Sequence, residues 1–217
     1  MGALDIVLDS LPSLLLGARV TLTLTGLAVL FGTIIGTFVG MARISKNKLI
    51  YGVATAYVEI IRGTPLLLQI YFCFFGLGQL GINLDEVTAA VVALAANCGG
   101  YTAEIVRAGI QAIPKGQMEA ARSLGMTYSQ AMRKVILPQA FRQMIPPMVN
   151  EFTAMLKDSS LVSILSITEL MRAGVIVVTR TYQAIPLLSA VGVIYFIMTF
   201  ILSQLANYLE RRLRTGD

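Results

Sequence analysis

Six polar or ionisable side chains in the apolar parts of this 217-residue chain have the chemistry to bind a charged small molecule: Asn97, Tyr101, Glu151, Lys157, Asp158 and Ser160. Lys157 and Asp158 are adjacent, so on a helix they point about 100° apart and cannot satisfy each other. A zwitterionic amino acid would offer a carboxylate to Lys157 and an ammonium group to Asp158. Ionisable groups inside a membrane span are costly, which makes them functional candidates.

The other candidates would complete this site. Ser160 would add a hydrogen bond, and Asn97 or Glu151 would reach a polar side chain of the ligand. Asn97, Tyr101 and Glu104 share one helical face, and we expect Glu104 to pair with Arg107 for structural reasons. The alternative interpretation is that these charges pair with other helices and hold the bundle together. The residues alone leave both interpretations open.

Catalysis by this chain is not expected. The sequence contains no histidine, and its two cysteines lie in apolar runs where small packing residues are typical. It contains no metal-ligand cluster, no placed nucleophile–base pair and no phosphate-cradling loop. We therefore predict no catalytic residue, no metal site and no cofactor bound by this chain, and an integral membrane enzyme is a weak alternative.

The elements that position the candidate residues are predicted to be membrane helices. The chain is 56% hydrophobic and 13% charged, whereas soluble domains average roughly 45–50% and about 25%. Five spans cannot close a barrel, so we expect an all-α integral membrane protein with a single domain over 1–217. The five apolar runs are residues 11–41, 64–80, 87–106, 144–165 and 184–205.

Charge predicts the orientation of these spans. Basic residues gather in the linker after the first span, in the linker between the third and fourth, and in the tail with Arg211, Arg212 and Arg214. Such segments belong on the cytoplasmic side. The N-terminus is therefore expected outside and the C-terminus inside, and the net charge of +5 reflects topology and not nucleic-acid binding.

Local patterns predict three further features. Gly32, Gly36 and Gly40 are spaced for close helix packing. The stretch 48–62 is amphipathic and is expected to extend the second helix into the inner interface, with Glu59 pairing with Arg62 and a kink at Gly63 and Pro65. Ser166 and Glu169 have capping-box spacing, which predicts a short helix that starts there.

A long polar loop, at about 112–138, is predicted to be helix–glycine–helix. Gly125 would end the first helix, in which Glu119 would pair with Arg122, and Thr127 with Gln130 would begin the second. Pro138 would mark the end of this second helix or the turn into the fourth span. Such a rigid polar pair favours a docking surface, in which the small side chains of Ala120 and Ala121 would let a partner groove admit the helix; the alternative is a loop packed on itself.

This loop resembles the EAA motif of permease subunits of ATP-binding-cassette importers. Glu119, Ala120 and Ala121 are followed by three residues, Gly125, nine residues, and then Val135-Ile136-Leu137-Pro138, with valine in place of the usual isoleucine. Other stretches are similar to the branch that takes up polar amino acids (histidine, glutamate, glutamine, arginine and opines): EIIRGTPLLLQ, YTAEIVRAGIQAI, LKDSSLVS and LERRLR.

The resemblance implies a type I importer permease in a bacterial-type inner membrane, with Glu119, Ala120, Ala121 and Gly125 coupled to the ATPase. It also implies two ATPase subunits that bind ATP and Mg²⁺, and an extracytoplasmic binding protein. Because five spans cannot easily enclose a path alone, a second permease copy or a related chain should pair with this one. The expected function is uptake of polar amino acids by alternating access; the alternative is a passive channel or ion-coupled carrier.

Overall fold

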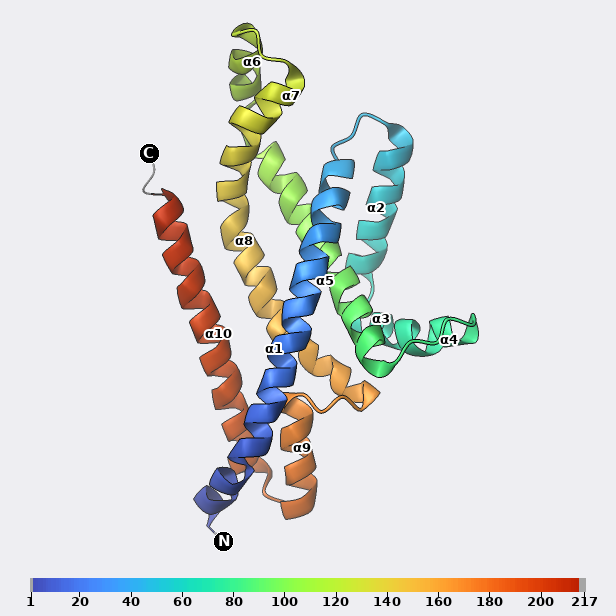
Figure 1. Cartoon of the computed structure of the whole chain (residues 1–217), viewed down its shortest axis with the longest axis vertical. Coiled ribbons are helices and arrows are strands. Elements are labelled where there is room, and N and C mark those ends of the chain that lie inside the picture. The colour runs from blue at the N-terminus through green and yellow to red at the C-terminus, as the bar shows by residue number, and fades with distance from the viewer. Residues whose placement is uncertain (1, 215–217) are drawn as a thin grey trace.

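The computed structural model describes residues 2–214 and, beyond Leu205, only the side chain of Tyr208, so the side chains of the tail arginines Arg211, Arg212 and Arg214 lie outside the described residues. The described chain is almost entirely helical (Figure 1). Its α-helices are α1 (Ala3–Ala42), α2 (Lys48–Gly63), α3 (Leu66–Tyr71), α4 (Leu77–Gln79), α5 (Glu86–Gln111), α6 (Lys115–Ser123), α7 (Tyr128–Ala131), α8 (Leu137–Asp158), α9 (Leu170–Thr181) and α10 (Ala184–Arg214). Two π-helical turns, η1 (Phe72–Gly76) and η2 (Met132–Ile136), and one 3₁₀ helix, η3 (Ser159–Leu165), connect some of them.

The number of helices that could cross a membrane agrees with the predicted number of spans. Among the described residues, α1, α5 and α10 are each long and apolar enough to cross a bilayer. Two bent pairs, α2 with α3–α4 and the helix 128–165 with α9, bring the number to as many as five. The prediction of an all-α membrane protein with about five spans is therefore confirmed.

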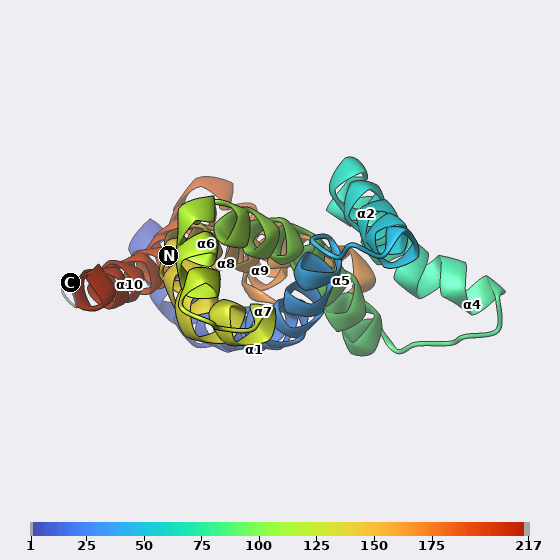
Figure 2. The ribbon, with the colours of Figure 1, turned by 90° about the horizontal axis from the view of Figure 1, so that it is seen from above.

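The second span differs from its prediction. The apolar run 64–80 was expected to cross the membrane, but α2 and the helical segment Leu66–Gln79 meet at 108°. Figure 2 shows α4 pointing sideways, away from the other helices. The 14 residues from Leu66 to Gln79 extend only about 21 Å as a helix, too short for ~30 Å of hydrocarbon. The amphipathic α2, which was expected only to extend this span into the interface, forms its longer part. The kink was predicted at the correct residues, but its size was not.

The entry into α8 also differs from its prediction. Pro138 was expected to end a helix or mark a turn, yet it lies in the first turn of α8, directly after η2. Proline lacks an N–H group and crowds the preceding turn, and a π-helical turn relieves that crowding by changing the hydrogen-bond register. The backbone therefore runs without a break from Tyr128 to Asp158 and through Pro146 and Pro147.

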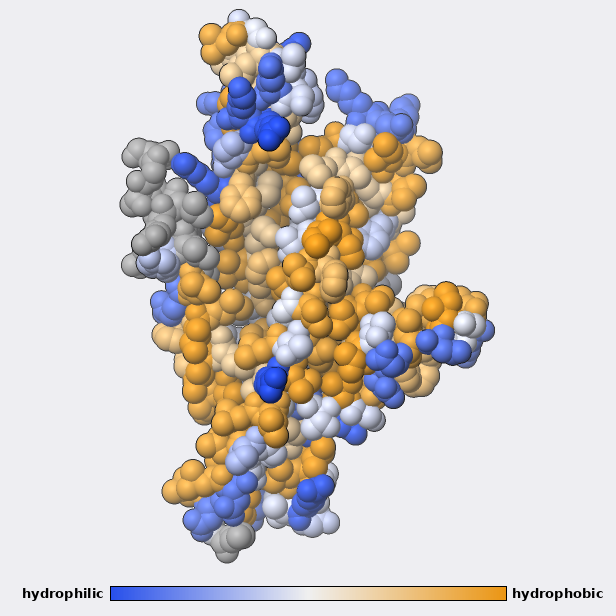
Figure 3. All heavy atoms as spheres, viewed as in Figure 1, coloured by the Kyte–Doolittle hydropathy of each residue, from blue (hydrophilic) through white to orange (hydrophobic). Residues whose placement is uncertain are grey.

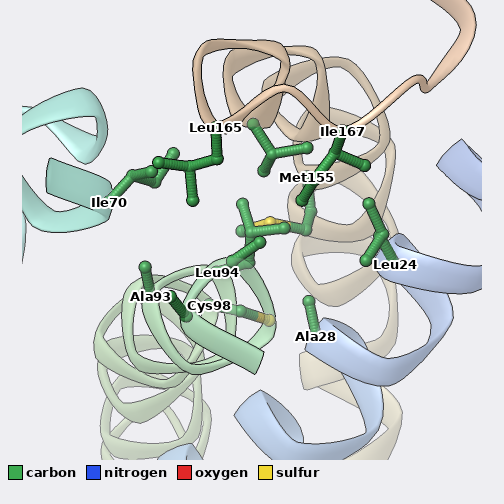
Figure 4. Packing of buried hydrophobic residues seen from close by; sticks show 12 residues of the cluster. Leu24, Ala28, Ile70, Ala93, Leu94, Cys98, Met155, Leu165 and Ile167 are labelled. Atoms are coloured by element: carbon green, nitrogen blue, oxygen red, sulfur yellow. The ribbon is translucent and has the colours of Figure 1, made fainter. Parts of the chain in front are cut away.

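Close packing of α1 against α5 forms the centre of the bundle, as the glycine spacing predicted. A Cβ atom on Gly32 would lie 2.6 Å from Cys98 Cβ, and one on Gly36 would lie 2.4 Å from Thr102 Cβ. Only glycine permits this approach. Figure 4 shows Leu24 and Ala28 of α1 beside Leu94 and Cys98 of α5, with residues of α3, α8 and the segment before α9 completing the core.

The two ends of the molecule carry most of the polar surface. In Figure 3 apolar atoms cover the middle, while hydrophilic residues gather around α6 and α7 at one end and near the N-terminus and α9 at the other. The α1–α2 linker, the α6–α7 loop and the end of α10 lie toward the same end, opposite the N-terminus (Figure 1). This arrangement agrees with the predicted orientation.

Glu169 begins α9, as expected, but by a different contact. Its side chain accepts hydrogen bonds from the backbone N–H groups of Met171 (2.8 Å) and Arg172 (2.7 Å), so Glu169 itself is the N-cap. Ser166, the predicted cap, instead has φ of 65° and ends η3. The carboxylate of Glu169 is fully buried and also accepts hydrogen bonds from Thr21 of α1 and Tyr195 of α10. One buried acid thus joins three helices, which the spacing of residues did not indicate.

Candidate functional site

The polar face of α5 contacts the bend between α2 and α3. Asn97 is only 6% exposed, and its Nδ2 donates a 3.0 Å hydrogen bond to Gln69 Oε1. Gln69 was not predicted as part of the site. It is a single polar residue within the apolar run 64–80, which was interpreted as a span, and nothing in its neighbours indicated a contact with α5. Asn97 therefore has a structural contact that its predicted role in binding did not include.

One turn further along α5, Tyr101 contacts α2. The guanidinium carbon of Arg62 lies 5.3 Å from the centre of the Tyr101 ring, a cation–π distance. The Arg62 guanidinium also reaches Glu104, at 4.0 Å. Arg62 is the last basic residue of α2, and the 108° bend that follows leaves its side chain against α5. Tyr101 and Arg62 thus form a second contact between α5 and the bend.

Glu104 is the centre of a charge cluster. The predicted pair with Arg107 is confirmed, with Arg107 Nε donating to Glu104 Oε2 at 3.1 Å. Arg43, at the end of α1, also pairs with Glu104, and with Glu59 at 3.8 Å. The predicted Glu59–Arg62 pair is wrong, since each of those residues pairs with a different helix. The cluster ties α1, α2 and α5 together.

The remaining candidates lie on α8 and η3. Glu151 is half-buried, Lys157 and Asp158 at the end of α8 are exposed, and Ser160 is half-buried in η3. None of these four side chains makes an ion pair or hydrogen bond within residues 2–214. The neighbouring Ser159 is buried instead, and its hydroxyl donates to the Leu156 carbonyl at 2.8 Å. These charges have no internal partner in the described part of the chain, and their contact with a substrate stays a prediction.

A groove of about 300 Å³ lies between α5 and α8, next to the candidate residues but lined by none of the six. It is lined by Glu104 and Ala108 from the polar face of α5 and by Gln143 and Pro147 from α8. Glu151 lies one turn beyond Pro147 on the same face of α8. The two polar faces that were predicted separately therefore border one space, although no hydrogen bond or ion pair joins Asn97 or Tyr101 to the α8 candidates in the described part of the chain.

The predicted order of a helix, a glycine and a second helix is observed in this loop. Gly125 has φ of 82°, and two backbone hydrogen bonds close the end of α6: Gly125 N–H donates to Arg122 O (3.0 Å) and Met126 N–H to Ala121 O (3.2 Å). This pairing is a Schellman motif, which requires the left-handed residue. Thr127 and Gln130 then form the expected capping box at the start of α7.

The predicted contact residues of the loop do not all lie on its surface. Glu119 and Ala120 are exposed, whereas Ala121 is 4% exposed and faces the loop's own interior. The expected Glu119–Arg122 pair is not formed within the described residues; Arg122 donates instead to the Met126 carbonyl at 2.9 Å. Glu119 therefore retains an unpaired carboxylate on the surface of α6.

Comparisons with known proteins agree with this geometry. Residues 10–215 match the family described as binding-protein-dependent transport system inner membrane component. The chain is 37% identical to the arginine transport system permease protein ArtQ of Bacillus subtilis (strain 168), covering 97% of this chain and 96% of that protein. It is 38% identical to the glutamine transport system permease protein GlnP of Escherichia coli (strain K12), covering 94% of each.

Solved structures show the same fold. The crystal structure of an amino acid ABC transporter with histidines superposes with a TM-score of 0.92 at 44% identity, covering 98% of this chain and 99% of that one. The MetNI methionine ABC transporter, at 23% identity, superposes with a TM-score of 0.80 over 93% of this chain and 96% of that one, which supports the fold alone. The resemblance seen in the EAA motif is confirmed, and the chain belongs to the inner membrane component family of binding-protein-dependent transport systems.

Proposed function

We propose that this chain is the permease subunit of an importer that takes up polar amino acids by alternating access, driven by a separate ATPase. The observation that carries the proposal is the α6–Gly125–α7 loop, a rigid polar segment at the end of the bundle that also holds the basic linkers. A permease that receives force from an ATPase needs such a rigid contact. The relatives named for arginine and glutamine transport support amino acids as the cargo.

Coupling is assigned to Glu119, Ala120, Ala121 and Gly125, within the segment of about 112–138. The exposed Glu119 carboxylate and the small Ala120 side chain would contact the ATPase, because they lie on the outer surface of α6. Ala121 would act from inside, because its small side chain allows α6 to pack closely on the loop. Gly125 would hold the angle between α6 and α7 through its left-handed conformation.

Substrate contact is assigned to Asn97, Tyr101, Glu151, Lys157, Asp158 and Ser160. Lys157 would bind the substrate carboxylate and Asp158 the substrate ammonium group, because both are exposed and have no partner within residues 2–214. Asn97 and Glu151 would contact the substrate side chain. Alternating access then requires two packed states with different exposure of this set.

The proposal implies partners. A second copy of the chain or a related permease would complete the path, two ATPase subunits would bind ATP and Mg²⁺, and an extracytoplasmic binding protein would deliver the amino acid. This chain would bind no nucleotide and carry out no chemistry of its own.

The test is uptake into proteoliposomes that contain the permease with or without its ATPase. We expect uptake of at least one of the twenty amino acids only when the ATPase and internal ATP are both present. Uptake without the ATPase would instead support a passive channel or an ion-coupled carrier. The same screen identifies the amino acid.

A further inference from the structure

The break between α2 and α3 leaves backbone carbonyl groups that a continuous helix would have satisfied. Thr64 is extended and Pro65 has no N–H group, so the last turn of α2 loses its donors. Side chains replace part of them, and Gln69 makes most of these contacts. Gln69 Nε2 donates to Ile61 O at 2.7 Å and lies 3.2 Å from Thr64 O.

The orientation of the Gln69 amide follows from these contacts. Its nitrogen also lies 3.0 Å from Thr64 Oγ1, and that hydroxyl uses its own hydrogen on Ile60 O at 2.7 Å. All three neighbours are therefore acceptors, and only the NH₂ group of Gln69 can face them. The carbonyl oxygen of the amide must point away from the break.

This orientation fixes the next amide in the chain of hydrogen bonds. Gln69 Oε1 accepts from Asn97 Nδ2 at 3.0 Å, so the NH₂ group of Asn97 faces Gln69 and its Oδ1 faces the other way. Asn97 Oδ1 accepts no hydrogen bond from the described residues. Three side-chain atoms of the described chain are both fully buried and unpaired: Thr33 Oγ1, Arg43 Nε and Thr55 Oγ1. Asn97 Oδ1 is unpaired but is not one of these three, so this atom is not fully enclosed. A side chain that is 6% exposed thus presents a single open acceptor.

We propose that Gln69 is a positioning residue that fixes Asn97 as a hydrogen-bond acceptor, so that the site favours amino acids whose side chains carry an N–H donor. The inference rests on the proposed function, in which Asn97 contacts the substrate side chain. An amide, guanidinium or ammonium side chain would donate to Asn97 Oδ1. A side-chain carboxylate has no hydrogen to donate, so it and Asn97 Oδ1 would both stay unpaired. Binding of such an amino acid would be disfavoured, because buried polar groups left without a partner reduce affinity strongly.

The experiment measures ATP-driven uptake by the permease assembled with its ATPase in proteoliposomes, using L-glutamine, L-arginine and L-glutamate as probes. For the unchanged protein we expect kcat/KM for glutamine or arginine to exceed that for glutamate by about tenfold or more. Gln69→Met removes both halves of the Gln69 amide and frees Asn97 to turn its NH₂ group toward a carboxylate. The preference should then fall by about tenfold, whereas a merely structural defect would lower all three uptake rates alike.

Two further variants keep the test decisive. Asn97→Leu removes the acceptor and leaves the break intact, so it should lose the same preference even if Gln69→Met fails to assemble. Gln79→Met, the same change at an exposed residue at the end of α4, should leave the preference unchanged. An unaltered preference in either assembled variant of Gln69 or Asn97 would overturn the inference.

The unchanged protein also tests the inference directly. Equal uptake of glutamate, or uptake only of amino acids whose side chains carry no N–H donor, would overturn it while the proposed function stands. ATP-driven uptake of no amino acid at all would overturn the proposed function and this inference with it.

Discussion

The carboxylate of Glu169, at the start of α9, accepts a 2.9 Å hydrogen bond from the Tyr195 hydroxyl in the middle of α10. The same carboxylate caps α9 and receives the Thr21 hydroxyl of α1 at 3.4 Å. Four donors surround an acid with no exposed surface. A buried acid is tolerated when it is hydrogen-bonded in this way, and it becomes costly to disturb.

Glu169→Ala should therefore destabilise the bundle. It removes the cap of α9 and leaves the Tyr195 hydroxyl unpaired, which together cost roughly 2 kcal/mol or more. Thermal unfolding of the detergent-solubilised protein measures the effect. Glu86→Ala is the control, because Glu86 is exposed in the first turn of α5, and it should change the unfolding midpoint little. Equal midpoints for the two variants would contradict the assigned role of Glu169.

Gly36→Ala should weaken the contact between α1 and α5. The added Cβ would lie 2.4 Å from Thr102 Cβ and 2.8 Å from the Gly99 carbonyl oxygen, so the helices must separate. Overpacking of this kind costs about 1–3 kcal/mol. Gly26→Ala in the same helix is the matched control, because nothing lies within 4 Å of the new atom. Its midpoint should stay the same or rise, since alanine favours helix by up to about 1 kcal/mol.

Gly125→Ala should disturb the loop without affecting the spans. A left-handed φ of 82° costs an L-residue about 1–2 kcal/mol, so the Schellman pairing should loosen. We expect faster hydrogen exchange at the Gly125 and Met126 amides and reduced ATP-driven uptake. Gly116→Ala, within α6 and with open space around it, should change neither measurement. Unchanged exchange in Gly125→Ala would show that the loop does not depend on this residue.

Glu119→Lys should abolish ATP-driven uptake while the protein still inserts into the membrane. The substitution reverses an exposed, unpaired charge on α6 where the ATPase is proposed to bind. Uptake assays with the complete complex measure the effect, and membrane content measures insertion. Glu86→Lys makes the same charge change at the first turn of α5 and should retain uptake. Near-normal uptake by Glu119→Lys would remove this residue from the coupling surface.

Asp158→Asn should weaken stimulation of ATP hydrolysis by the transported amino acid. A hydrogen bond to a charged group contributes roughly 1.5–3 kcal/mol. The amino-acid concentration that gives half-maximal stimulation should therefore rise by about tenfold or more. Asp9→Asn, at an exposed residue near the N-terminus, is the control. If both variants respond like the unchanged protein, Asp158 belongs to the structure and not to the binding site.

Local signals in the sequence predicted the local parts of the fold well. Gly125 and the Thr127–Gln130 box are determined by residues only a few positions apart, and both are observed as expected. The spacing of Gly32 and Gly36 predicted a close helix contact, because a glycine stripe has few other uses in a span.

Contacts between distant residues were not predictable in the same way. The kink at Pro65 was expected, but its 108° angle was not, nor was the hydrogen bond beside it between Gln69 and Asn97, which are 28 residues apart. The joining of Glu169 to Thr21 and Tyr195, like that of Arg43 to Glu104, requires knowing which helices are neighbours. Hydrophobic runs give the length of a span and not its partners.

The π-helical turn η2 has a mechanical consequence. Because it carries the backbone past Pro138, residues 128–158 form one continuous helical rod, roughly 45 Å long at ~1.5 Å per residue, in which Pro146 and Pro147 leave two hydrogen bonds unmade. One tip of this rod is the capping box at Thr127, and the other carries Lys157 and Asp158. A tilt imposed at Thr127 would therefore be carried along one helix toward the two charges, and the proline pair is the point at which that helix would bend.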